Sequence, residues 1–139
     1  MSHDQAKAGT IRVLVVDDHH VVRSGLAAMI RAEENMSLVG EAESGAQALE
    51  LYRTLSPDVT LMDIRMPGMN GIDVLRSLRK EYPSCAVLML SSYDGDEDIY
   101  QSLQAGARGY LLKSMRNAEI AEAIRIVHAG GHHLPPKVA

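Results

Sequence analysis

The sequence contains no tryptophan and no phenylalanine, and aromatic residues make up only 4% of its 139 residues. A folded core must therefore be built from Val, Leu, Ile, Met and Ala. Cysteine is almost absent too, because Cys85 stands alone and cannot form an internal disulfide. The apolar surroundings of Cys85, CAVLML, indicate a buried strand. A single free thiol is typical of the reducing cytoplasm, and we expect the protein there.

Long apolar runs are also missing, and none approaches the ~20 residues that a membrane-spanning helix requires. The first ten residues, MSHDQAKAGT, lack the apolar segment of a signal peptide, and we expect residues 1–10 to form a flexible tail. Basic residues are dispersed and the net charge is −4, so we do not expect the chain to bind nucleic acid by itself.

The length of the chain and its hydrophobic content of 46% favour one globular domain.

Apolar runs alternate along the chain with segments of helical periodicity. Such alternation predicts an α/β fold with a doubly wound, five-stranded parallel sheet and helices on both faces. A TIM barrel is excluded because it needs about 250 residues. The sequence HHLPPKVA, residues 132–139, resembles the start of a linker, so we place the domain at residues 11–131. The expected strands cover residues 10–16, 37–43, 58–62, 86–90 and 108–112.

Polar residues stand where four of these strands end. Asp17 and Asp18 follow the first strand, Asp63 the third, Ser91 the fourth and Lys113 the fifth. Ligands of open α/β sheets bind outside the carboxyl ends of the strands, so we expect these side chains to converge at one edge of the sheet.

Each of these residues also has an ordinary structural explanation. Asp18 taken alone would cap the following helix, Asp63 would form a turn, Ser91 would cap a helix, and Lys113 would be a solvated loop residue. The combination changes this assessment, because neighbouring carboxylates repel by roughly 4 kcal/mol per pair at an effective dielectric constant near 20. A cation relieves that repulsion, and all-oxygen ligation favours Mg²⁺ over zinc. Lysine and hydroxyl groups beside the metal would hold a phosphoryl group while Asp63 attacks it.

The loop after Asp63 has an unusual composition, with the sequence LMDIRMPGMNG spanning residues 61–71. Pro67 restricts the preceding residue to extended geometry, while Gly68 and Gly71 permit a tight turn. This composition predicts a stiff, tightly turned connection after Asp63. The adjacent pairs His19-His20 and His132-His133, in contrast, lack metal-binding helical spacing, and we interpret them as surface or loop residues.

The segments VVDDHH, LMDIRMPGMNG, MLSS and GYLLKS, in this order, resemble the receiver domain of two-component response regulators. The resemblance extends from about Ile11 to Gly130. The segments DDHHVVRSGL and GARGYLLKS are similar to the NarL/FixJ class, whose members usually carry a LuxR-type helix-turn-helix after the receiver. The resemblance implies the flavodoxin-like strand order 2-1-3-4-5.

The resemblance also implies a signalling role. The domain would take a phosphoryl group from a histidine kinase and catalyse its own phosphorylation and dephosphorylation, without being an enzyme in the usual sense. Phosphorylation would alter the face formed by the fourth helix, fifth strand and fifth helix and promote homodimer formation. DNA would be bound only through an output domain that is absent from this chain. The implied site residues are Asp63 (phosphoacceptor), Lys113 and Ser91 (phosphoryl contacts), Asp17, Asp18, Asp63 and the Arg65 backbone carbonyl (Mg²⁺), and Ser91 with Tyr110 (switch pair).

Two alternatives remain open from the sequence. One is a phosphatase of the haloacid-dehalogenase type, in which Asp63 would be a covalent nucleophile. Such enzymes have a second acid two residues later, where this chain has Arg65. The other is a degenerate receiver that acts as an unphosphorylated interaction module, against which the complete set of acids and Lys113 argues.

Overall fold

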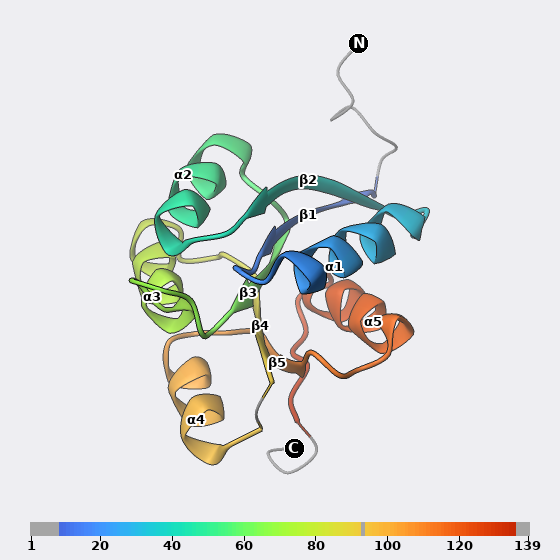
Figure 1. The fold of residues 1–139 in the computed structure, drawn as a ribbon. Coiled ribbons are helices and arrows are strands. Elements are labelled where there is room, and N and C mark those ends of the chain that lie inside the picture. The colour runs from blue at the N-terminus through green and yellow to red at the C-terminus, as the bar shows by residue number, and fades with distance from the viewer. Residues whose placement is uncertain (1–8, 93, 136–139) are drawn as a thin grey trace.

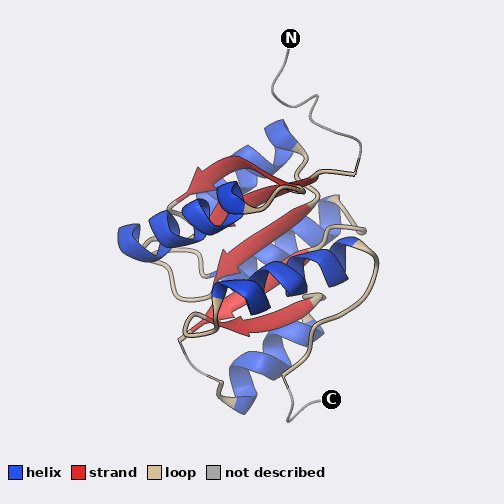
Figure 2. Ribbon diagram, turned by 90° about the vertical axis from the view of Figure 1, so that its right-hand side faces the viewer, coloured by secondary structure: helices blue, strands red, loops and turns tan. Residues whose placement is uncertain are grey.

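The computed structural model describes residues 9–92 and 94–135 and places them in a parallel sheet covered by helices on both faces (Figures 1 and 2). The expected tail lies almost entirely outside the described residues, as do residues 136–139 of the expected linker. The strands are β1 (Ile11–Val16), β2 (Met36–Ala42), β3 (Val59–Asp63), β4 (Val87–Ser91) and β5 (Gly109–Leu112). The helices are α1 (His20–Ala32), α2 (Gly45–Leu55), α3 (Gly71–Glu81), α4 (Asp96–Gln104) and α5 (Asn117–His128).

The strand order is β2-β1-β3-β4-β5, and all neighbouring strands are parallel. Helices α1 and α5 cover one face, while α2, α3 and α4 cover the other (Figure 1). Successive strand residues point to opposite faces. Val15 and Leu61 thus pack with α1 and α5, whereas Val16 and Met62 pack in the core on the opposite face. This arrangement confirms the predicted doubly wound fold and explains its nearly continuous apolar strands.

Two strands extend one residue further than the sequence pattern suggests. Asp63 and Ser91 are the last residues of β3 and β4, because the backbone hydrogen bonds between neighbouring strands continue past them. Ile64 N–H donates to the Leu90 carbonyl at 3.1 Å, and Lys113 N–H donates to the Ser91 carbonyl at 2.9 Å. The carboxylate and the hydroxyl are therefore held by the sheet and not by a loose connection.

Cys85 precedes β4 and is only 3% exposed, which confirms its predicted burial. The same burial raises the pKa of its thiol. None of the helices in the described part of the chain combines the length and the apolar character needed to cross a membrane.

Helix α5 is followed by Gly130 in a left-handed conformation with φ of 98°, which glycine adopts readily after the end of a helix. The chain then returns to the sheet, where His133 forms a parallel bridge with Gly109 of β5. Tyr110 N–H donates to the His133 carbonyl at 3.1 Å, and His133 N–H donates to the Arg108 carbonyl at 3.0 Å. The segment interpreted as a linker thus begins by pairing with the edge strand.

The turn between β3 and α3 depends on Gly71. Its backbone N–H donates to the Ile64 carbonyl at 2.9 Å, which draws the start of α3 against the end of β3. A Cβ atom added to Gly71 would lie 2.0 Å from the Asp63 carbonyl oxygen. No side chain fits in this space, so glycine is required by close approach of two backbone segments.

Replacement of Gly71 by alanine should therefore destabilise the fold by about 1–3 kcal/mol, the usual cost of overpacking. Urea unfolding would measure the change in the free energy of unfolding. Gly95→Ala provides the matched control, because a Cβ at Gly95 meets no described atom within 4 Å. Equal stability of both variants would contradict the proposed role of Gly71.

Candidate functional site

The acidic pair lies directly after β1, at the carboxyl edge of the sheet. Asp17 is fully buried, and its Oδ1 accepts a hydrogen bond from the His19 backbone N–H at 2.8 Å. Asp18 is partly exposed, and it does not occupy the capping position of α1. That position belongs to His19, and within the described residues no side chain caps the helix there. The structural explanation of Asp18 as a helix cap is therefore wrong.

Asp63 and Lys113 complete a compact group of charges with the acidic pair. The Lys113 Nζ atom lies 3.0 Å from Asp17 Oδ2 and 3.1 Å from Asp63 Oδ1. The Asp63 side chain is 1% exposed and the Lys113 side chain 12% exposed. Because β1 and β3 are adjacent and parallel, their carboxyl ends bring Asp17 and Asp63 together at the point where the strand order reverses.

The electrostatics of this group follow from burial and crowding. Burial raises the pKa of Asp63 to about 6, and the nearby Asp17 charge adds to the rise, although Lys113 opposes it. Burial alone would lower the pKa of Lys113, but its hydrogen bonds to Asp17 and Asp63 outweigh that effect and raise it. The Lys113 ammonium thus forms ion pairs with two buried carboxylates, and the site retains an excess of negative charge.

The remaining oxygen of Asp63 indicates what the site lacks. Asp63 Oδ2 is buried and has no hydrogen-bond partner among residues 9–92 and 94–135. An unsatisfied buried carboxylate oxygen is costly, and a divalent cation would satisfy it. Ligand atoms of Asp17, Asp18, His19 and Asp63 all lie within 4.8 Å of one another, a spacing compatible with one shared ion. The carboxylate oxygens are of the kind that Mg²⁺ prefers, but the Mg²⁺ ion and the role of the Arg65 carbonyl stay predictions.

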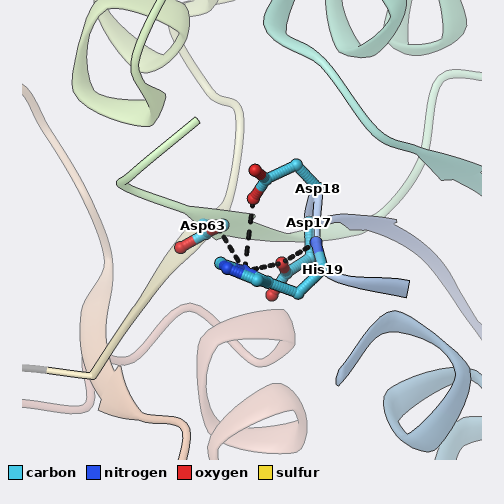
Figure 3. A group of neighbouring side chains, drawn as sticks. All are labelled: Asp17, Asp18, His19 and Asp63. Carbon is cyan, nitrogen blue, oxygen red and sulfur yellow. Dashed lines mark hydrogen bonds and ion pairs between the residues drawn. The ribbon is translucent and has the colours of Figure 1, made fainter. Parts of the chain in front are cut away.

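His19 is the residue that the sequence analysis misplaced. Its imidazole points into the acidic group, as Figure 3 shows, and not away from the metal chemistry as we expected. His19 Nδ1 lies 3.2 Å from Asp17 Oδ1, 3.3 Å from Asp18 Oδ1 and 3.9 Å from Asp63 Oδ2. The signal in the sequence was its position directly after the acidic pair, but helical spacing alone could not reveal it.

Ser91 and Tyr110 form a second part of the site. Both are almost completely buried, and they belong to the paired strands β4 and β5. Burial raises the pKa of Tyr110, and the nearby Ser91 side chain opposes this rise. Tyr110 is 2% exposed, and its side chain therefore lies inside the fold. Its role as a switch residue stays a prediction.

An open cleft of about 870 Å³ lies beside Asp63, and its lining residues include His19, Arg65, Ser92, Asp98 and Lys113. Across it, the Arg65 guanidinium forms an ion pair with Asp98 of α4 at 2.6 Å. This pair connects the loop after Asp63 with the fourth helix. Sequence patterns do not reveal this ion pair, because its partners are 33 residues apart.

Comparisons with known proteins agree with this geometry. The family model for the response regulator receiver domain matches residues 13–125. The transcriptional regulatory protein LiaR of Bacillus subtilis (strain 168) is 43% identical over 129 residues, which cover 93% of this chain and 61% of LiaR. DegU of Brevibacillus brevis is 38% identical over 136 residues, covering 98% of this chain and 58% of DegU. The chain thus spans about three fifths of the length of these relatives.

Solved structures lead to the same family. The signal receiver domain of the response regulator NarL from Mycobacterium tuberculosis matches with a TM-score of 0.84 at 40% identity, covering 87% of this chain and 98% of that one. The chain therefore belongs to the response regulator receiver domains of two-component systems, and its relatives are regulators of the LuxR/NarL type.

Proposed function

We propose that Asp63 accepts a phosphoryl group from the phosphohistidine of a histidine kinase. The observation that carries this proposal is the buried Asp63 carboxylate, which has one oxygen beside Lys113 and a second, unpartnered oxygen beside the acidic pair. A carboxylate in this position has a free oxygen for attack, while the neighbouring groups receive the charge of the phosphoryl oxygens.

In the proposed transfer, an Asp63 oxygen forms the new bond to phosphorus as the bond between phosphorus and the kinase imidazole nitrogen breaks. The electron pair of the broken bond stays on the imidazole, and the product is an acyl phosphate on Asp63. Lys113 pairs with the phosphoryl oxygens, while Asp17 and Asp18 hold a Mg²⁺ ion together with Asp63. The metal, when bound, supplies positive charge that offsets the charge of the incoming group.

The consequences of phosphorylation belong to the same proposal. The acyl phosphate adds about −1.5 to −2 charges at the edge of the sheet. Ser91 turns from Tyr110 toward the phosphoryl group, and the surface of α4, β5 and α5 changes to favour a homodimer. Homodimer formation in turn controls a DNA-binding output domain of the kind that the resemblance implies. We place this signalling in the cytoplasm.

The phosphatase alternative receives less support from the site. Its second acid would stand at position 65, where Arg65 instead pairs with Asp98. The degenerate-receiver alternative is weakened by the presence of the acids and the lysine in contact with one another. Turnover of a small phosphoester by the purified chain would favour the phosphatase.

Incubation with acetyl phosphate and Mg²⁺ should add the mass of one phosphoryl group to the chain, as intact-protein mass spectrometry would detect. Asp63→Asn should abolish the gain, because an amide oxygen does not form the acyl phosphate, and removal of Mg²⁺ with a chelator should prevent it as well. Asp73→Asn, which changes an exposed carboxylate of α3, is the control and should gain the phosphoryl mass as the wild type does. An undiminished gain in Asp63→Asn would refute the assignment.

The raised pKa of Asp63 also predicts how stability depends on pH. The folded state binds the Asp63 proton more tightly than the unfolded chain, whose pKa is near the ordinary value of 3.8. Ionised Asp63 therefore destabilises the fold, with no effect below about pH 4 and the full effect above about pH 6. At 1.36 kcal/mol per pKa unit, the free energy of unfolding falls by up to about 3 kcal/mol.

Urea unfolding of the wild type and Asp63→Asn between pH 4 and pH 7 would measure this loss. The stability of the wild type relative to the variant should fall across the range, and saturating Mg²⁺ at pH 7 should restore it. Asp73→Asn should show no such divergence from the wild type. A constant difference between the wild type and Asp63→Asn at all pH values would contradict the raised pKa.

A further inference from the structure

The position of His19 adds a nitrogen atom to a site that the sequence predicted to contain only oxygen ligands. Its Nδ1 approaches carboxylate oxygens of three residues, Asp17, Asp18 and Asp63, at 3.2, 3.3 and 3.9 Å. A single imidazole N–H can donate to only one of them. Asp17 Oδ1 already accepts a hydrogen bond from the His19 backbone. Hydrogen bonding therefore explains only part of this arrangement.

Shared coordination of one ion explains more of it. Around an ion with bonds of about 2.0–2.2 Å, neighbouring ligand atoms lie roughly 2.8–3.6 Å apart. The distances from His19 Nδ1 to Asp17 and Asp18 fall in this range, and the distance to Asp63 exceeds it only slightly. The buried Asp63 Oδ2, which accepts no hydrogen bond from the described residues, faces the same space.

We propose that His19 Nδ1 is a metal ligand, and that it makes the site bind transition-metal divalent cations more tightly than Mg²⁺. Imidazole nitrogen contributes little to Mg²⁺, which prefers oxygen, but it binds Mn²⁺, Co²⁺ and Ni²⁺ with increasing strength. The inference uses the acidic group of the proposed function but requires no phosphorylation. The metal that occupies the site would then depend on the concentrations of the competing cations as well as on the ligands of the site.

Calorimetric titration with Co²⁺ and with Mg²⁺, in the absence of any phosphodonor, tests this inference. Co²⁺ should bind the wild type at least about tenfold more tightly than His19→Ala, whereas Mg²⁺ affinity should change much less. Excess Mg²⁺ should displace this Co²⁺, which distinguishes the site from the other histidines. His20→Ala is the matched control, since its side chain lies outside the acidic group, and it should bind Co²⁺ as the wild type does.

Equal Co²⁺ affinity in the wild type and His19→Ala would overturn the inference, as would Co²⁺ that Mg²⁺ cannot displace. The proposed function is judged separately, by the mass gain of the wild type with acetyl phosphate and Mg²⁺. A chain that binds Co²⁺ through His19 but gains no phosphoryl group would refute the proposed function and leave the metal ligand in place.

The pairing of His133 with β5 carries a second, independent inference. Without it, β5 would expose the backbone groups of an edge strand. A Cβ on Gly109 would lie 2.6 Å from the His133 carbonyl oxygen, so the close approach depends on glycine at that position. Tyr110 is therefore held through its backbone by the His133 carbonyl.

We infer that the segment that begins at His132 holds the edge strand β5 in place through its backbone hydrogen bonds. Amide hydrogen exchange measured by NMR tests this inference.

Two substitutions at one position test the pairing itself. His133→Pro removes the donor to the Arg108 carbonyl and should make the Tyr110 amide exchange at least about tenfold faster. His133→Ala keeps both backbone hydrogen bonds and should leave the Tyr110 amide protected. Equal protection of the Tyr110 amide in both variants would show that the segment does not hold β5.

Discussion

The crowding of negative charge around one ammonium group is the constraint on which the site depends. Asp17 and Asp63, both almost fully buried, share the Lys113 ammonium at 3.0 and 3.1 Å. Asp18 adds a third carboxylate, so the positive charge is insufficient and the pKa of Asp63 rises to about 6. The same imbalance would favour a bound cation, because binding would relieve a repulsion already present.

The sheet maintains this unfavourable arrangement. Parallel pairing of Val16 with Met62 brings the ends of β1 and β3 side by side, which leaves Asp17 and Asp63 little freedom to separate. Gly71 allows α3 to start directly against the Asp63 carbonyl, so the turn between β3 and α3 is tight. Apolar packing on both faces of the sheet supplies the stability that offsets the electrostatic cost.

Sequence patterns predicted the sheet and the convergence of Asp17, Asp63 and Lys113, because strand ends in such folds meet at one edge, and the family resemblance predicted the strand order. They failed where a side chain's direction depends on tertiary packing. The His19 side chain is 60% exposed but lies against the acidic group, and the pairing of His133 with β5 is a long-range contact without local periodicity. The sequence interpretation of both histidines as ordinary surface or loop residues therefore missed their contacts.

The buried position of Cys85 has a practical consequence for study of the domain. Its thiol is 3% exposed and has a raised pKa, so it stays protonated and out of reach of maleimides and similar alkylating reagents. As the sequence contains no other cysteine, a thiol introduced on the surface of α4 would be the sole reactive one. A fluorophore or spin label could thus be attached to a single chosen point without first removing the native residue.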